Sequence, residues 1–140
     1  MSQRRSFERR FEALAEIVGF TAAALTGRGV DAEQSRSIDF AIEELFTNMI
    51  KYSRGGANPV EIAIECGAEA VAVTLVDTDG EPFDVTAAPE VDTALPLEQR
   101  RPGGLGIHLV RRLVQDLSYE YRATTRESRI SFRVPCRRSA

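Results

Sequence analysis

Two neighbouring segments in the middle of the chain alternate between apolar residues and residues that tolerate water. The apolar positions are Val60, Ile62, Ile64, Val71, Val73 and Leu75. Gly67 lies between the two segments. Because successive side chains of a strand point to opposite faces of a sheet, the pattern predicts a β-hairpin with one buried face. Another part of the chain must cover that face.

Three other segments have the apolar spacing of amphipathic helices. They cover residues 11–25, a stretch that begins after Asp31 and ends near Tyr52, and the residues that follow Gly103–Gly106. Gly27–Gly29 ends the first helix, and Asp31 with Gln34 has the spacing of a capping box at the start of the second.

Two more strands are predicted at about 118–124 and 129–135, and residues 4–10 form either a short edge strand or a frayed start. The order is helix, helix, two strands, a long irregular segment, helix, two strands. Runs of strands interrupted by helices are typical of an α+β two-layer sandwich.

The composition is that of one ordinary soluble domain over residues 1–140, with 43% apolar and 28% charged residues. A net charge of −3 gives no reason to expect nucleic acid or an anionic membrane as a partner. No stretch approaches the roughly 18 apolar residues of a membrane span, and the first ten residues are polar and basic, so we expect a cytoplasmic protein. Residues 84–102 are expected to form a lid or binding loop, and residues 137–140 a loose tail.

Glu44 and Asn48 lie four residues apart on the second predicted helix, so their side chains share one face beside the apolar stripe. A carboxylate suits a general base. An amide oxygen can bind Mg²⁺ without adding charge, because Mg²⁺ fills the rest of its shell with water and phosphate. Taken alone, the pair also fits an ordinary solvated Glu and Asn.

The segment Gly103-Gly104-Leu105-Gly106 opens the third predicted helix. Backbone N–H groups there can approach a phosphate without a Cβ in the way, and a helix N-terminus favours negative charge. Arg100 and Arg101 lie just upstream and can clamp a terminal phosphate. The alternative is a flexible hinge with a solvated arginine pair.

A polar run from Asp77 to Phe83 follows the second strand of the hairpin and, taken alone, fits a simple turn. Together the three blocks resemble the GHKL ATPase superfamily, and more closely its short single-domain branch, the anti-sigma-factor serine/threonine kinases. Glu44–Asn48 is similar to the family's E-x-x-x-N helix motif, Gly104–Val110 to its G-x-G motif and following helix, and Gly80–Asp84 to its adenine motif. The resemblance covers about residues 10–135.

The resemblance implies the Bergerat fold, a two-layer α/β sandwich with a mixed, mostly antiparallel sheet and helices on one face. It also implies ATP and Mg²⁺ as cofactors, with Glu44 as the catalytic base and Asn48 as the metal ligand. The nucleotide-binding positions that it implies are Asn48, Asp77, Thr78, Asp79, Gly80, Arg101, Gly103, Gly104, Leu105, Gly106, Ile107 and Ser128.

The adenine end departs from the family pattern. The family aspartate usually lies two residues before the glycine, and Thr78 occupies that position here. Asp77 is in phase with the buried residues of its strand, so it continues the buried face. We infer one extra residue in the turn and expect Asp77 to bind the adenine amino group. Ser128 either donates a hydrogen bond in the nucleotide pocket or is a plain turn residue.

The function that the resemblance implies is a serine/threonine kinase of the partner-switching type. Such a kinase phosphorylates a small antagonist (anti-anti-sigma) protein, binds a sigma factor or another regulator in the alternative state, and forms a homodimer. Two alternatives stay open: a non-catalytic nucleotide-binding module that sequesters a regulator, and a slow free-standing ATPase. The presence of both Glu44 and Asn48 favours the kinase.

Overall fold

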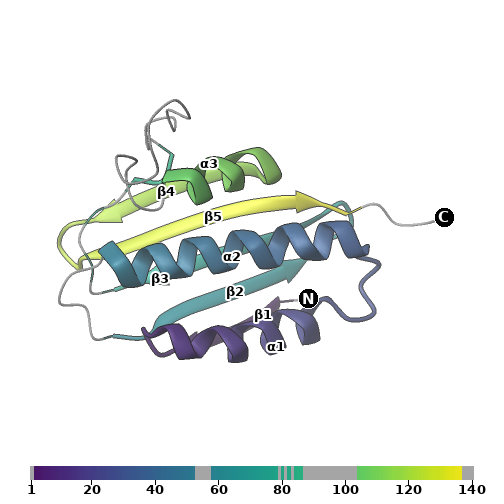
Figure 1. The fold of residues 1–140 in the computed structure, drawn as a ribbon, viewed down its shortest axis with the longest axis horizontal. Helices are drawn as coiled ribbons and strands as arrows, with labels where there is room; N and C mark the ends of the chain where they lie inside the picture. Colours follow the sequence, from purple (N-terminus) through teal and green to yellow (C-terminus); the bar gives the residue numbers. More distant parts are fainter. Residues whose placement is uncertain are drawn as a thin grey trace.

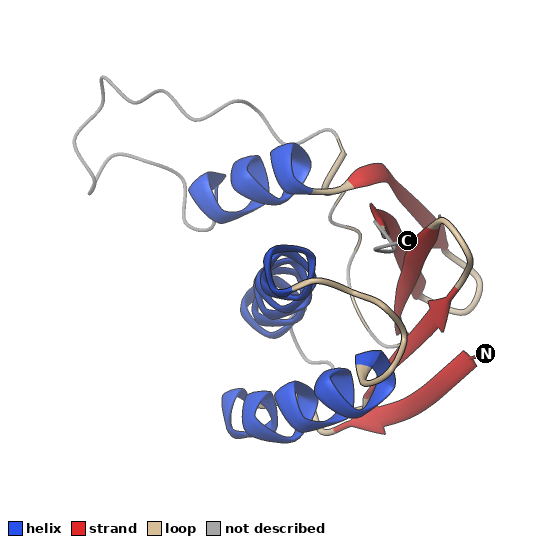
Figure 2. Cartoon of the chain, turned by 90° about the vertical axis from the view of Figure 1, so that its right-hand side faces the viewer, coloured by secondary structure: helices blue, strands red, loops and turns tan. Residues whose placement is uncertain are grey.

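The structure is a computed structural model that describes residues 2–52, 58–78, 80, 82, 84–86 and 104–136. A five-stranded sheet forms one layer, and the helices pack on one of its faces (Figures 1 and 2). The elements are β1 (Ser2–Phe7), η1 (Phe11–Ala13), α1 (Leu14–Leu25), α2 (Ala32–Tyr52), β2 (Val60–Cys66), β3 (Ala70–Asp77), α3 (Gly104–Leu113), β4 (Gln115–Arg122) and β5 (Glu127–Pro135). The predicted two-layer α+β sandwich is confirmed.

The sheet has the strand order β1-β2-β3-β5-β4, and each of its four pairings is antiparallel. The resemblance implied a mixed, mostly antiparallel sheet, whereas the described strands pair in the antiparallel direction throughout. The N-terminal residues form an edge strand rather than a frayed start. β3 lies in the centre, and its last residue, Asp77, is paired with Val60 of β2 on one side and with Ser128 of β5 on the other.

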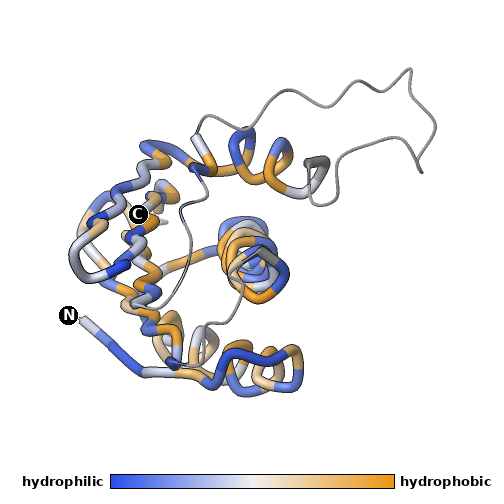
Figure 3. The backbone as a smooth tube through the Cα atoms, turned by 90° about the vertical axis from the view of Figure 1, so that its left-hand side faces the viewer, coloured by the Kyte–Doolittle hydropathy of each residue, from blue (hydrophilic) through white to orange (hydrophobic). Residues whose placement is uncertain are grey.

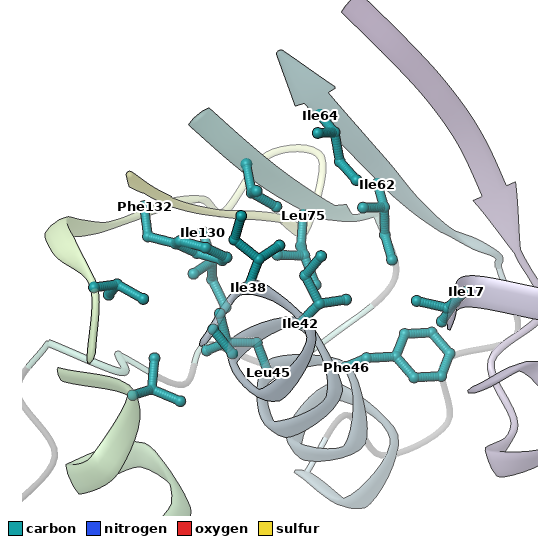
Figure 4. Packing of buried hydrophobic residues seen from close by; sticks show 14 of the residues in the cluster. Ile17, Ile38, Ile42, Leu45, Phe46, Ile62, Ile64, Leu75, Ile130 and Phe132 are labelled. Atoms are coloured by element: carbon teal, nitrogen blue, oxygen red, sulfur yellow. The ribbon is translucent and has the colours of Figure 1, made fainter. Parts of the chain in front are cut away.

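The buried face of the β2–β3 hairpin packs against α2, as the alternation in the sequence required. The fully buried residues of this face are Val60, Ile62, Ile64, Val71, Val73 and Leu75. Figure 4 shows Ile38 and Ile42 of α2 lying against strand residues such as Leu75. Hydrophobic and hydrophilic residues follow one another closely along both layers (Figure 3), because each element buries only one side.

The ends of the first two helices follow the signals in the sequence. Gly27 and Gly29 follow α1 with φ of 74°, a backbone conformation that glycine adopts without steric cost. At the start of α2, the Gln34 backbone N–H donates to Asp31 Oδ1 at 2.8 Å, and the Asp31 N–H donates to Gln34 Oε1 at 3.2 Å. This reciprocal pair is the predicted capping box.

Several predicted boundaries were wrong by a few residues. The first helical segment begins as the 3₁₀ turn η1, and α1 starts only at Leu14. β4 begins at Gln115 rather than 118, and β5 at Glu127 rather than 129. The start of β4 contains a register shift before Ser118, where Asp116 has a φ of 55°. A bulge of this kind breaks the alternation on which a strand prediction depends.

The predicted lid at 84–102 is described only at its start. Val85 is buried in the core, so residues 84–86 are attached to the body of the domain. Residues 87–102 of the lid and the tail at 137–140 lie outside the described residues. Among the described helices, none combines the length and the apolar composition needed to cross a bilayer.

Candidate functional site

α2 carries Glu44 and Asn48 one helical turn apart, and Glu44 lies against α3. Leu45 and Phe46, between them in sequence, are fully buried and anchor this part of α2 in the core. Asn48 is itself buried, with 4% of its surface exposed, whereas Glu44 is half-buried. The predicted pair therefore lies at the border between the core and the surface, where side chains can meet a ligand and still be held in place.

Asn48 has one amide atom that the described residues do not engage. Its Nδ2 donates to the backbone carbonyl of Glu44 at 2.6 Å, while its buried Oδ1 has no hydrogen-bond partner in the described part of the chain. An unsatisfied buried polar atom costs about 1–3 kcal/mol, so this oxygen points to a ligand. An amide oxygen is a hard donor of the kind that Mg²⁺ accepts beside water and phosphate, and Asn48 thus fits the metal-binding role.

Glu44 lies directly against Gly106 of α3. A Cβ added at Gly106 would lie 2.6 Å from Glu44 Cδ and 3.3 Å from Cγ, and would overlap Oε2. Only glycine leaves room for the carboxylate at this position. The contact joins the E-x-x-x-N helix to the G-x-G segment, two motifs that are far apart in the sequence.

Burial raises the pKa of the Glu44 carboxyl above its usual range, and the nearby charge of Glu43 raises it further, whereas Lys51 lowers it in part. A carboxylate with a raised pKa is a stronger base than an ordinary surface glutamate. The environment of Glu44 therefore favours proton acceptance.

The first turn of α3 supplies backbone donors beside this carboxylate. α3 begins at Gly104, so the N–H groups of Gly104, Leu105 and Gly106 belong to the first helical turn and have no acceptor within the helix. The side chain of Ile107 is buried in the core, so this residue can contact a phosphate only through its backbone. Such a helix start favours an anion.

The far end of the site lies where β3 stops. Asp77 is 2% exposed and Ser128 is 6% exposed, and their places as paired residues put both side chains on the helix-covered face. Thr78, the position favoured by the family spacing, is exposed, and its Oγ1 accepts a hydrogen bond from Asn58 Nδ2 at 3.4 Å. The prediction that Asp77 continues the buried face is therefore confirmed. Its role toward adenine stays a prediction.

Arg9 holds the Asp77 carboxylate, and the sequence analysis missed it. Arg9 Nη1 donates to Asp77 Oδ2 at 2.9 Å, and Nη2 donates to Oδ1. Both side chains are buried, with 6% and 3% exposed. A carboxylate in phase with a buried strand face was a signal that some cation would pair with it. Nothing in the pattern distinguished Arg9 from the arginines beside it.

The turn after β3 is tied to the β4–β5 hairpin at the same end of the sheet. The Tyr121 hydroxyl donates to the Gly80 carbonyl at 3.2 Å, and the Gly80 N–H donates to the Arg126 carbonyl at 3.5 Å. Gly80, a predicted site residue, is buried in this position. The predicted residues Asp79, Arg101 and Gly103 lie outside the described part of the chain.

The chain is similar to several solved structures. The crystal structure of the RsbU and RsbW domains of Rv1364c from Mycobacterium tuberculosis is similar with a TM-score of 0.65 and 14% identity, over 100% of this chain and 35% of that one. The histidine kinase AdeS of Acinetobacter baumannii has a TM-score of 0.48 and 17% identity, over 96% and 68% of the two chains. The mycobacterial sensor histidine kinase MprB has a TM-score of 0.49 and 13% identity, over 98% and 100%.

The chain spans about a third of the length of the Mycobacterium tuberculosis chain that it resembles. No curated protein matches it. The family model described as the histidine kinase-like ATPase domain matches residues 7–133, which is nearly the whole chain. The chain therefore belongs to the family of histidine kinase-like ATPase domains, in the GHKL superfamily that its three motif blocks resemble.

Proposed function

We propose that this chain is an ATP-dependent serine/threonine protein kinase of a partner-switching system. The observation that carries the proposal is the contact between Glu44 and Gly106. In this contact a carboxylate of raised pKa lies beside the N-terminus of α3, which is the proposed phosphate-binding segment. A kinase of this type needs a base and a phosphate-binding segment near one reacting hydroxyl, and here two distant parts of the chain supply them.

Each residue then has one task. Backbone N–H groups of Gly104 and Gly106 hold the phosphates, and Asn48 Oδ1 holds Mg²⁺. Bound Mg²⁺ neutralises charge on the transferring phosphoryl group. Glu44 accepts the proton of the attacking serine or threonine hydroxyl. Asp77 binds the adenine amino group and Ser128 lies next to it.

The proposed partners are a small antagonist protein with a phosphorylatable serine or threonine, and a sigma factor or another regulator, with the kinase acting as a homodimer. The motif set and the shared fold with a structure that contains an RsbW domain support this assignment. Phosphorylation adds about −2 charge to the antagonist's interface and releases it. Bound nucleotide selects the partner through its different affinity for the two states.

The test is phosphate transfer from labelled ATP to small candidate antagonist proteins encoded beside the gene. The wild type should transfer label, and Glu44→Gln should lose about 10²–10⁴-fold in rate. Glu33→Gln, an exposed carboxylate in the first turn of the same helix, is the matched control and should keep the wild-type rate. The product should resist acid, as phosphoserine and phosphothreonine do, whereas phosphohistidine is hydrolysed.

The alternative function is a non-catalytic nucleotide-binding module that sequesters a regulator. It needs the same nucleotide site but makes no use of Glu44 as a base. A wild-type protein that binds ATP but transfers no phosphate to any candidate antagonist would support this alternative over the kinase.

A further inference from the structure

Arg9 pairs with Asp77, the carboxylate that binds adenine in the proposed function. Its guanidinium meets both oxygens of Asp77, with Nη1 2.9 Å from Oδ2 and Nη2 on Oδ1. A fork of two parallel N–H···O bonds is the strongest arrangement between these two groups. With 3% of its side chain exposed, Asp77 presents almost no surface to a molecule arriving from solvent.

The same guanidinium also contacts backbone carbonyls in the C-terminal part of α2 and in the segment before β2. Arg9 Nη1 lies 3.5 Å from the carbonyl of Met49, the residue after Asn48, and Nε donates to the carbonyl of Asn58 at 3.3 Å. These two contacts are longer and go to uncharged acceptors, so they are weaker than the pair with Asp77. Asp77 is therefore the main anchor of the Arg9 side chain.

The backbone around Arg9 lets the side chain leave without unfolding the domain. Residues 8–10 belong to no helix or strand and connect β1 to η1. Phe7 and Ala13 hold the segment on either side, because both are buried in the core. The neighbours Glu8 and Arg10 are exposed and pair with each other at 2.9 Å. The long Arg9 side chain can therefore change its rotamer while the segment stays anchored at both ends.

We infer that Arg9 and the adenine amino group compete for Asp77, so that Arg9 sets both the affinity and the base selectivity of the nucleotide pocket. The inference rests on the proposed nucleotide site. An amino group donates to a carboxylate but not to a guanidinium, so ATP binds fully only after Arg9 has moved. A pocket that is open in about 1–10% of molecules binds its ligand about 10–100-fold more weakly than the open pocket does.

The competition predicts opposite effects on two nucleotides. Adenine carries an amino group, which needs the carboxylate of Asp77. Hypoxanthine carries a carbonyl oxygen at the same place, which the guanidinium of Arg9 can satisfy and the carboxylate repels. Removing the guanidinium should therefore tighten the binding of ATP and leave the binding of inosine triphosphate unchanged or weaker.

The experiment is calorimetric titration of wild type, Arg9→Met and Arg10→Met with Mg-ATP and with Mg-inosine triphosphate. Arg10→Met is the matched control, because the Arg10 side chain is exposed and, in the described part of the chain, forms its ion pair with Glu8. Arg9→Met should bind ATP at least about tenfold more tightly than the wild type and should gain nothing for inosine triphosphate. Arg10→Met should match the wild type with both nucleotides.

Three results would overturn the competition and leave the nucleotide site standing. Arg9→Met could bind ATP as tightly as the wild type, could bind it more weakly, or could gain equally in affinity for both nucleotides. Absence of ATP binding in all three proteins overturns the nucleotide site and the competition together. If Arg9→Met does not fold, the NMR signal of the Arg9 Nε–H group in the wild type decides. It should shift and lose protection from solvent exchange at saturating ATP, and an unchanged signal overturns the inference.

Discussion

Replacing Gly106 by alanine should separate catalysis from folding. The new Cβ would lie 2.6 Å from Glu44 Cδ and 3.3 Å from Cγ, so the Glu44 side chain must leave its place beside α3. It can do so, because the obstructing atoms belong to the end of a flexible side chain that is only half-buried. The substitution thus removes the carboxylate from the site without removing it from the protein.

The two consequences differ in size. Alanine is favoured over glycine inside a helix by about 1 kcal/mol, and displacing Glu44 into a poorer rotamer costs about 0.5–1.5 kcal/mol. The free energy of unfolding should therefore stay within about 1 kcal/mol of the wild type. Phosphoryl transfer should fall about 10²–10⁴-fold if Glu44 is the base, which corresponds to about 3–5 kcal/mol of transition-state stabilisation.

Urea unfolding measures the first quantity, and single-turnover transfer from labelled ATP measures the second. Calorimetry with ATP shows whether the variant has also lost phosphate binding. The decisive comparison is between Glu44→Ala and the double variant Glu44→Ala/Gly106→Ala. Because the carboxylate is already gone in Glu44→Ala, the added alanine should lower the transfer rate by less than about threefold more. Wild-type activity in Gly106→Ala, or two losses that multiply, would refute the proposed position of the base.

Three further predictions concern stability. Gly19→Ala in α1 should stabilise the protein by about 0.5–1 kcal/mol in urea unfolding, since no heavy atom lies within 4 Å of the added Cβ, and a loss would contradict the described surroundings. Asp31→Ala removes the acceptor of the capping box and should cost about 0.5–2 kcal/mol in the same assay, whereas an unchanged midpoint would mean that the cap is not formed in solution. Burial, with the charge of Glu43 adding to it, raises the pKa of the Asp39 carboxyl above 3.8. The contribution of Asp39 to stability is therefore present below its unfolded pKa and is lost as pH rises through its folded pKa. Asp39→Asn should be more stable than the wild type at pH 7 but not below pH 3.8, and a gain of equal size at both pH values would show that Asp39 does not titrate in this way.

Much of the fold follows from local patterns that the sequence contains in full. The alternation in residues 60–76 determined the hairpin and its buried face, because a strand repeats every two residues. The spacing of Asp31 and Gln34 determined how α2 begins. The four-residue spacing of Glu44 and Asn48 placed them on one helix face, and the phase of Asp77 placed it inside. Each of these properties depends on neighbours in the chain, so the sequence alone was enough.

The contacts between motifs depend instead on how the layers stack. Arg9 meets Asp77 across 68 positions of sequence. In the sheet, β3 lies next to β5 and not next to β4, the strand that follows β3 along the chain. Arg4, Arg5, Arg9 and Arg10 were equivalent as cations until the fold buried one of them against a carboxylate. Likewise, a glycine before a helix showed only that something approaches closely, and the packing of α3 on α2 decided that Glu44 does. Such choices belong to tertiary structure, because the energy of a buried charge depends on which partner the packing brings within reach.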